Sequence, residues 1–144
     1  MNLDMLKAAM KPLEDFGKDE IEIEVNGTIV VLKTLLPVEE VSCQKYASGV
    51  LEQIREEIDI ENDQMSRHGA LDYFDKFRTE VISYAIIKIG ALDFRGVEFI
   101  ETGELLDNGK PKKIKRQLAL RNIIQESWSR AMITICFSKY GDLI

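Results

Sequence analysis

The chain has 144 residues, of which 45% are hydrophobic and 31% are charged, with nine glycines, three prolines and two cysteines. This length and balance fit one globular domain with an appendage, and they exclude collagen-like, mucin-like and fully disordered classes. The net charge is −6, with acids concentrated in residues 37–64 and bases in residues 112–144. We expect these regions to pair, within a chain or head to tail, and we do not expect a protein that coats nucleic acid over its whole surface.

The N-terminal segment, residues 2–16, has its larger apolar side chains at helical spacing. Leu3, Leu6, Met10 and Leu13 form one stripe, which predicts a short amphipathic helix. Pro12 removes one backbone hydrogen bond from that helix, and so short a helix is marginal in water. We therefore predict that residues 1–18 form an arm that needs a surface to lie on, and that residues 19–144 form a single α+β domain.

Residues 20–36 carry a β-hairpin signal. The alternating run EIEIEV is followed by Asn26-Gly27 and then by a second β-rich run. An Asn-Gly pair favours a two-residue turn because both positions tolerate positive φ. The alternation places Ile21, Ile23 and Val25 on one face and the glutamates on the other.

The rest of the domain is predicted to be a three-helix body. Pro37-Val38-Glu39-Glu40 suits the first turn of a helix over residues 37–58, and Gly49 suggests a close packing contact within it. The second helix is expected over residues 68–92, after a polar connector at 59–67, and the third over residues 116–139, where Trp128 is expected in the core. Residues 93–111 fit a loop or a second hairpin, in which residues 97–100 and Ile114 pair across Asp107-Asn108-Gly109.

Several functional classes lack their residues. The longest apolar run, residues 81–92, is too short to span a membrane and contains Lys88, and the N-terminus lacks the apolar core of a signal peptide. We therefore expect a cytoplasmic protein that makes no membrane contact. Cys43 and Cys136 are expected to be buried thiols, not a bridge.

Catalytic and cofactor motifs are likewise incomplete. The only histidine, His68, is interpreted as a helix-boundary residue and not as a catalytic base, and a zinc site lacks ligands. Residues 59–63 resemble the start of a calcium loop, but Gln64 and Ala70 stand where that loop needs Gly and Glu. Residues 103–110 have the wrong spacing for a phosphate loop, and Pro111 replaces its Ser or Thr. We expect no enzyme activity, no metal and no cofactor.

The basic run at residues 110–116, KPKKIKR, leaves three interpretations open. It is a solvated loop, a surface for an acidic protein, or a nucleic-acid contact. Stacking aromatics usually accompany single-strand binding, and no aromatic residue occurs between Phe99 and Trp128. The apolar flanks of the second and third helices are similarly open, since they fit either the core or a partner.

The order of elements resembles that of the small tail or baseplate assembly proteins of bacteriophages. The matching stretches are Ile23 to Glu40 (IEVNGTIVVLKTLLPVEE), Tyr84 to Gly90, and a C-terminal amphipathic helix over Ile123 to Tyr140. This resemblance implies a non-enzymatic assembly chaperone that binds tail or baseplate proteins, located in the host cytoplasm or retained in the virion. The acidic connector and the basic run depart from that pattern.

Three alternatives for function therefore stand. The first is the assembly chaperone, the second a permanent structural subunit or adaptor of the virion, and the third a small nucleic-acid-binding regulator, which we do not favour. We expect partner contacts, including self-association, through the arm and the edge of the 20–36 hairpin. The expected partner-binding residues are Leu3, Leu6 and Met10 on the arm, with Ile133, Phe137 and Tyr140 on the outer flank of the last helix.

Overall fold

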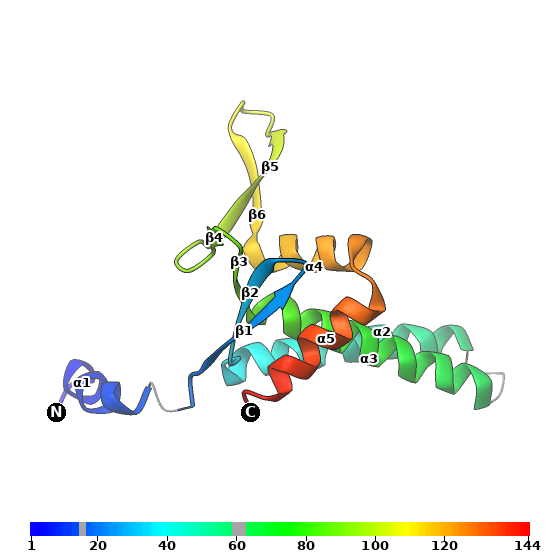
Figure 1. Cartoon of the computed structure of the whole chain (residues 1–144), viewed down its shortest axis with the longest axis horizontal. Coiled ribbons are helices and arrows are strands. Elements are labelled where there is room, and N and C mark those ends of the chain that lie inside the picture. Colours follow the sequence, from blue (N-terminus) through cyan, green and yellow to red (C-terminus); the bar gives the residue numbers. More distant parts are fainter. Residues whose placement is uncertain (15–16, 59–62) are drawn as a thin grey trace.

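The computed structural model describes residues 1–14, 17–58 and 63–144, with side chains described outside residues 50–72. Within this part of the chain the fold is mixed α/β, with a four-stranded antiparallel sheet and a separate two-stranded one (Figure 1). The helices are α1 (Leu3–Glu14), α2 (Pro37–Ile58), α3 (Asp63–Ala85), α4 (Arg116–Ser127) and α5 (Arg130–Gly141). The strands are β1 (Glu20–Val25), β2 (Thr28–Lys33), β3 (Ile86–Ile89), β4 (Leu92–Asp93), β5 (Phe99–Leu105) and β6 (Pro111–Lys115).

The predicted first hairpin is confirmed as β1 and β2. Its turn has Asn26 at φ 51° and Gly27 at φ 77°, the left-handed conformations that a two-residue hairpin turn requires. Ile23 pairs with Val30, and Ile21 with Leu32. The hairpin does not stand alone, because β3 pairs with the other side of β2 and β4 pairs with β3. Only β1 and the short β4 therefore lie at the edges of this sheet.

The predicted helix over residues 68–92 is wrong at both ends. The helix α3 begins at Asp63, within the expected polar connector, and ends at Ala85. The run Ile86–Ile89 continues directly as β3 and pairs with β2. Pairing with β2 satisfies the backbone of this β-branched run and buries Ile86 and Ile87. His68 thus lies inside α3 and not at its boundary. Its side chain, and the side chains of the calcium-like pattern at 59–63, lie outside the described part of the chain.

The predicted single helix over residues 116–139 is two helices. The first, α4, ends at Ser127, and Trp128 adopts an extended backbone as its C-cap. Ser129 then begins α5, and its hydroxyl accepts a hydrogen bond from the Met132 N–H at 3.1 Å. The body therefore contains four helices among the described residues, not three. The side chain of Trp128 packs against the edge of the core and is half-buried.

The bounds predicted for the helix over residues 37–58 are confirmed by α2. Glu39 accepts a hydrogen bond from the Leu36 N–H at 2.8 Å and pairs with Lys33, also at 2.8 Å. A glutamate at the third helical position that reaches back to the cap is one half of a capping box. Gly49 does not mark a close contact, because a Cβ built there would meet no atom within 4 Å.

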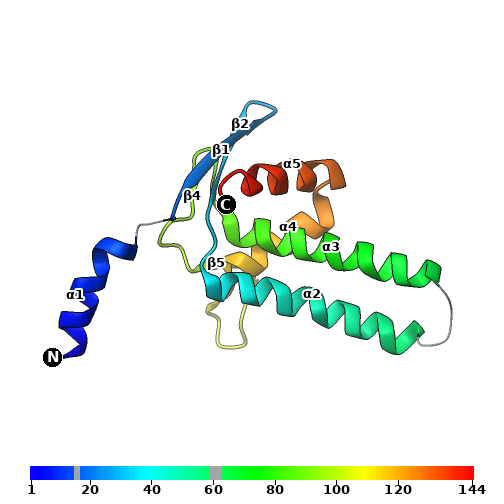
Figure 2. The same ribbon diagram turned by 90° about the horizontal axis from the view of Figure 1, so that it is seen from below.

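The core lies between the inner face of the four-stranded sheet and the helices α2 to α5 (Figure 2). Leu32, Ile82, Ile86 and Ile124 are fully buried within it. Cys43 and Cys136 are also fully buried and are free thiols, as predicted.

Two elements project from this body (Figure 1). One is the hairpin of β5 and β6, the second of the two alternatives for residues 93–111, in which Ile100 lies opposite Ile114. The other projecting element is α1, at the opposite side of the molecule from the tips of α2 and α3 (Figure 2). None of the helices in the described part of the chain is long and apolar enough to cross a membrane.

Candidate protein-binding surface

The helix α1 stands off the body as an amphipathic element. Asn2 begins it, because its side-chain Oδ1 accepts a hydrogen bond from the Met5 N–H at 2.9 Å, as a helix N-cap does. Asp4 in its first turn and Lys11 in its last turn match the positive and negative ends of the helix dipole. The cap and these two charges favour the helix locally, although so short a helix is marginal in water without a surface to lie on.

The apolar stripe of α1 has no partner in the described structure. Leu3, Leu6, Met10 and Leu13 are 62%, 47%, 51% and 68% exposed, and no residue of the helix is buried. The stripe therefore leaves about half or more of each of its four large apolar side chains in solvent and adds little to the hydrophobic stabilisation of the fold. Contiguous exposed apolar side chains of this kind mark a surface for another protein or a membrane.

The second feature is the free edge of β1. The Thr34 N–H bonds to Asp19 O at 3.0 Å, which fixes the odd-numbered residues of β1 as those whose backbone groups face β2. The backbone groups of Glu20, Glu22 and Glu24 consequently face away from the sheet. All three glutamate side chains are exposed. Such an edge can accept a further strand.

Arg95 neutralises only the first of these glutamates. Its guanidinium donates to Glu20 Oε2 at 2.9 Å and to Asp93 Oδ2 at 2.9 Å. Hydrogen bonds to Glu20 and then to Asp93 raise the pKa of Arg95 above its usual value. Among the described side chains, Glu22 and Glu24 have no ion-pair partner.

The C-terminal flank predicted as a partner surface faces inward. Tyr140 is 5% exposed and belongs to the core cluster. Ile133 and Phe137 are half-buried and pack against that cluster. The break at Trp128 turns α5 relative to α4. Positions that would share one face of a continuous helix over residues 116–139 therefore do not share a face in the structure. The expected outer contact at Ile133, Phe137 and Tyr140 is therefore wrong for Tyr140. For Ile133 and Phe137, only the exposed part of each half-buried side chain is accessible to a partner.

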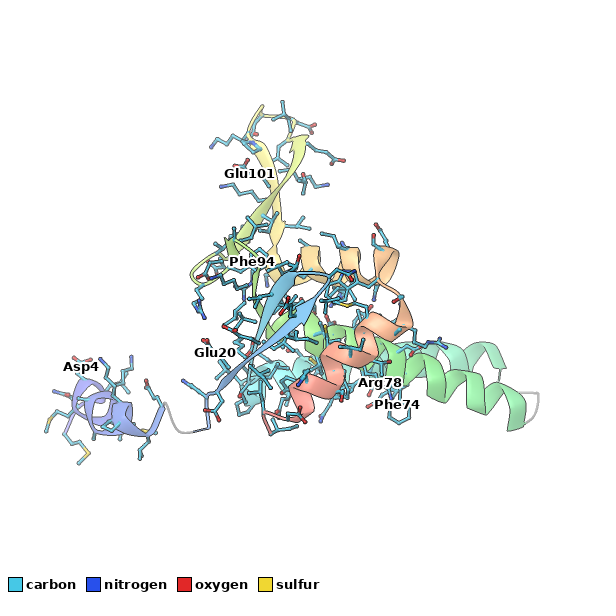
Figure 3. The ribbon with its side chains drawn as sticks, viewed as in Figure 1. Asp4, Glu20, Phe74, Arg78, Phe94 and Glu101 are labelled. Carbon is cyan, nitrogen blue, oxygen red and sulfur yellow. The ribbon has the colours of Figure 1, made fainter. Side chains whose placement is uncertain are left out.

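An aromatic ridge on α3 borders that flank. Phe74 is 51% exposed, and Arg78 lies beside it in Figure 3, with its guanidinium 6.0 Å from the Phe74 ring centroid and 5.7 Å from that of Phe137. The Phe77 ring lies between two other rings: its centroid is 6.2 Å from that of Tyr73, on α3, and 6.3 Å from that of Phe137, on α5. These contacts tie α3 to α5, and only Phe74 extends well into solvent.

The basic run lies on the projecting hairpin. Residues 111–115 form β6, and all of them except Ile114 are exposed. Lys112 lies 3.5 Å from Glu104, and Lys113 is directly opposite Glu101 on β5. The run is therefore an exposed strand and not a loop, with acidic residues on its partner strand.

None of the ion pairs among the described side chains joins the acidic region 37–64 to the basic region 112–144, contrary to the pairing predicted from the sequence. Arg121 pairs with Glu80 and Arg130 with Asp75, so these two bases contact α3, and Lys112 pairs with Glu104 on its own hairpin. The acids at residues 52–63 lie outside the described side chains.

A buried polar cluster lies between α2, α3 and α4, formed by Tyr46, Glu80, Ser83, Gln117 and Arg121. The Glu80 side chain is 1% exposed and accepts hydrogen bonds from Arg121 Nε at 2.9 Å and from Gln117 Nε2. Ser83 Oγ lies 3.1 Å from Glu80 Oε1 and 2.8 Å from Gln117 Nε2. The Arg121 guanidinium also lies 4.0 Å from the ring centroid of Tyr46.

This Glu80 cluster has the properties of a structural clamp. Burial disfavours the charge of Arg121, but hydrogen bonds and attraction from Glu80 outweigh that effect and raise the pKa of Arg121. Every buried polar side-chain atom in the described residues has a hydrogen-bond partner. An open hollow of about 230 Å³ is lined by Asp75, Thr79, Gln125 and Trp128 among others, but not by Glu80. A general base must reach its substrate, and Glu80 does not.

The clamp was missed by sequence reasoning, although a signal for it exists. Glu80 is a single acid beside the apolar run that starts at Val81, and Arg121 is a single base between Leu120 and Ile123. One unmatched charge in each of two apolar helix faces indicates a buried ion pair. Among the described residues, no group of three or more His, Cys, Asp and Glu side chains is arranged to hold a metal ion.

Comparisons with known proteins give no match: no family model, no curated protein and no solved structure is similar to this chain.

Proposed function

We propose that the protein is a non-enzymatic binding factor that docks α1 into an apolar groove of a partner protein during assembly of a bacteriophage tail or baseplate. The observation that supports this most directly is α1 itself, a capped amphipathic helix with a stripe of four exposed apolar side chains and no buried residue. The phage assignment rests on the resemblance of the element order to small tail and baseplate assembly proteins. The assembly-chaperone role follows from that resemblance.

The physical basis is the recognition of an amphipathic helix in a groove. Burying a side chain such as Leu or Met contributes about 1.5–3 kcal/mol, and the loss of translational and rotational freedom offsets much of that sum. Leu3, Leu6 and Met10 follow the i, i+3, i+7 spacing that such grooves accept. Lys7 and Glu14 border the stripe on one side, so the groove is expected to have a mixed-charge rim.

The body contributes a rigid mount for this helix. The buried Glu80 cluster holds α2, α3 and α4 together, and the arm precedes β1 of the sheet, with residues 15–19 between them. Losing the arm contact should therefore leave the body folded. A reversible chaperone and a retained virion subunit use the same contact, and they differ in whether purified particles contain the chain.

The test compares two charge-matched variants of α1. Leu6→Glu/Met10→Glu places two carboxylates on the stripe, and Met5→Glu/Ala8→Glu places two on the opposite side of the same helix. We expect the stripe variant to weaken binding to purified tail or baseplate proteins by at least about tenfold, or 1.4 kcal/mol. The control variant should bind within about threefold of the wild-type chain, and neither should shift the thermal unfolding of the body.

Two results would contradict the proposal. Equal binding by the stripe variant and the wild-type chain would place the interface elsewhere. Unfolding of the body by the stripe variant would mean that α1 belongs to the core. Mass spectrometry of proteins that copurify from the native source, and of purified particles, then separates a transient factor from a permanent subunit. Copurifying nucleic acid with a steep salt dependence would instead favour the regulator alternative.

A further inference from the structure

Two free strand edges of this chain are complementary to each other. One is β1, at the edge of the four-stranded sheet, and the other is β6, in the two-stranded sheet of the projecting hairpin. The two strands belong to different sheets and do not pair within the chain. Figure 3 shows Glu20 at the end of β1 near the body and Glu101 far out on the hairpin.

The backbone groups of β6 that face its free edge belong to lysines. The Arg116 N–H bonds to Glu98 O at 3.0 Å, which fixes residues 112 and 114 of β6 as those that face β5. Lys113 and Lys115 therefore direct their N–H and C=O groups outward. On β1 the outward groups belong to Glu22 and Glu24, by the same reasoning from the Asp19–Thr34 bond.

The side chains match in the same register as the backbone groups. An antiparallel pairing of the two edges that sets Glu24 against Lys113 sets Glu22 against Lys115. Both are then hydrogen-bonded pairs, in which opposite side chains lie on one face of the sheet. Ile23 falls opposite Ile114 on the other face, so the charged and apolar patterns both match.

The charges concerned form no ion pair within the described part of the chain, although Lys113 lies across from Glu101 on β5. Lys113 and Lys115 are exposed and, like Glu22 and Glu24, have no ion-pair partner among the described side chains. Opposite charges directly across two strands stabilise their pairing, and like charges destabilise it. An acidic edge repels another acidic edge, which disfavours pairing of β1 with β1.

We infer that β6 of a second copy of this chain adds to the β1 edge, with Lys113 opposite Glu24 and Lys115 opposite Glu22. Each copy carries one β1 edge and one β6 edge, so the contact is heterologous: it closes into a ring or a reciprocal dimer, or extends head to tail. This contact is separate from the α1 stripe and does not depend on the proposed function.

The experiment is analytical ultracentrifugation of the full chain up to about 1 mM, the weak end of ordinary affinities. We expect concentration-dependent self-association that weakens with added salt, because exposed charges are screened. Glu22→Lys/Glu24→Lys and Lys113→Glu/Lys115→Glu should each reduce the association constant by at least about tenfold. A one-to-one mixture of these two variants, and the chain carrying all four changes, should recover it. Glu126→Lys/Asp142→Lys, a matched charge reversal of one exposed acid on α4 and one at the C-cap of α5, should not change it.

A second pair of variants tests the strand edge itself. The outward N–H of Lys113 does not bond to β5, so Lys113→Pro removes a donor of the free edge and leaves the hairpin intact. Lys113→Gln removes the same charge and keeps the donor. Lys113→Pro should weaken association at least about threefold more than Lys113→Gln. Amide protection at Glu22, Glu24 and Lys115 should rise with concentration.

Three results would overturn the inference. The first is a monomer over the whole concentration range. The second is loss of association in Leu6→Glu/Met10→Glu, which would place the contact on α1. The third is failure of the mixture and of the four-change chain to recover association, which would show that the two charged edges do not face each other.

Discussion

Glu80 and Arg121 face each other across the α3–α4 interface, where Arg121 donates from Nε to Oε1 at 2.9 Å and from Nη2 to Oε2. The Glu80 side chain is 1% exposed and the Arg121 side chain 21% exposed. Because water does not reach the carboxylate, its charge is compensated almost entirely by Arg121, Gln117 and Ser83. The pair therefore makes α3 and α4 dependent on each other.

Removing one member of this pair should be strongly destabilising. Arg121→Met leaves the Glu80 carboxylate buried without its counter-charge, and we expect a loss of about 3–5 kcal/mol in the free energy of unfolding. Glu80→Leu/Arg121→Met removes both charges and should cost much less, since apolar replacement of a buried pair is often neutral. Urea denaturation of the single and double variants measures both values. A single variant within about 1 kcal/mol of the wild-type chain would contradict this reading of the pair.

Two glycines should respond oppositely to alanine. Gly27 has φ 77° in the β1–β2 turn, so Gly27→Ala strains the backbone by about 1–2 kcal/mol. Gly49 lies within α2, is exposed and has no atom within 4 Å of a built Cβ. Gly49→Ala should therefore stabilise the chain by roughly 0.5–1 kcal/mol. Thermal unfolding of the two variants gives the signs, and destabilisation by Gly49→Ala would indicate a contact at that position.

The parts of the fold that sequence predicted correctly are those set by neighbouring residues. Asn26-Gly27 and its flanking alternation specify the first hairpin, and Pro37 with Glu39 specifies the start of α2. The second hairpin, one of the two alternatives for residues 93–111, turns through Asp107-Asn108-Gly109, where only Gly109 has positive φ. These signals act over a few residues, so no knowledge of the rest of the chain is needed to use them.

The predictions of secondary structure were wrong where contacts with residues distant in sequence determine whether a segment forms a helix or a strand. The run Ile86–Ile89 is as apolar as the helix before it, and only its pairing with β2 makes it a strand. The division between α4 and α5 was hidden because apolar residues continue on both sides of Trp128. Ser129, a strong N-cap residue type, was the available signal.

The candidate site was predicted in part. The arm helix and its stripe follow from the spacing of Leu3, Leu6 and Met10, and these side chains are exposed. Tyr140 was misplaced because the turn at Trp128 rotates α5. Whether the arm and the β1 edge bind a partner stays a prediction.

The two thiols should make stability fall at alkaline pH. Burial raises the pKa of Cys43 to about 12, with further contributions from Glu80, Glu39 and Glu40, and burial raises that of Cys136 to about 11. Each folded-state pKa lies above the model-peptide value of 9.0, so the unfolded chain loses its proton first. The stability contribution is complete below pH 9 and falls as pH rises toward the folded values, by up to about 1.4 kcal/mol per pH unit per thiol.

Urea unfolding between pH 8 and pH 10 measures that slope, and thiol labelling checks its cause. The native chain at pH 8 should react with a thiol reagent far more slowly than the urea-unfolded chain, because the reactive thiolate is scarce and buried. Rapid labelling of two thiols in the native chain would contradict the burial of Cys43 and Cys136.

Trp128 should contribute less to stability than a core tryptophan and more than a surface one. It is the C-cap of α4, its N–H bonds to Ile124 O at 3.1 Å, and its side chain is half-buried against the core. Trp128→Ala keeps the backbone bond and removes the ring. A fully buried Trp→Ala change costs about 3–5 kcal/mol, so we expect about 1.5–3 kcal/mol here.

Ser129→Ala removes the neighbouring cap and should cost about 1 kcal/mol, which provides the matched comparison at the same junction. Urea unfolding followed by circular dichroism measures both variants. A cost above about 4 kcal/mol for Trp128→Ala would mean that the ring is fully buried in the core, and a cost below about 1 kcal/mol would place the ring in solvent.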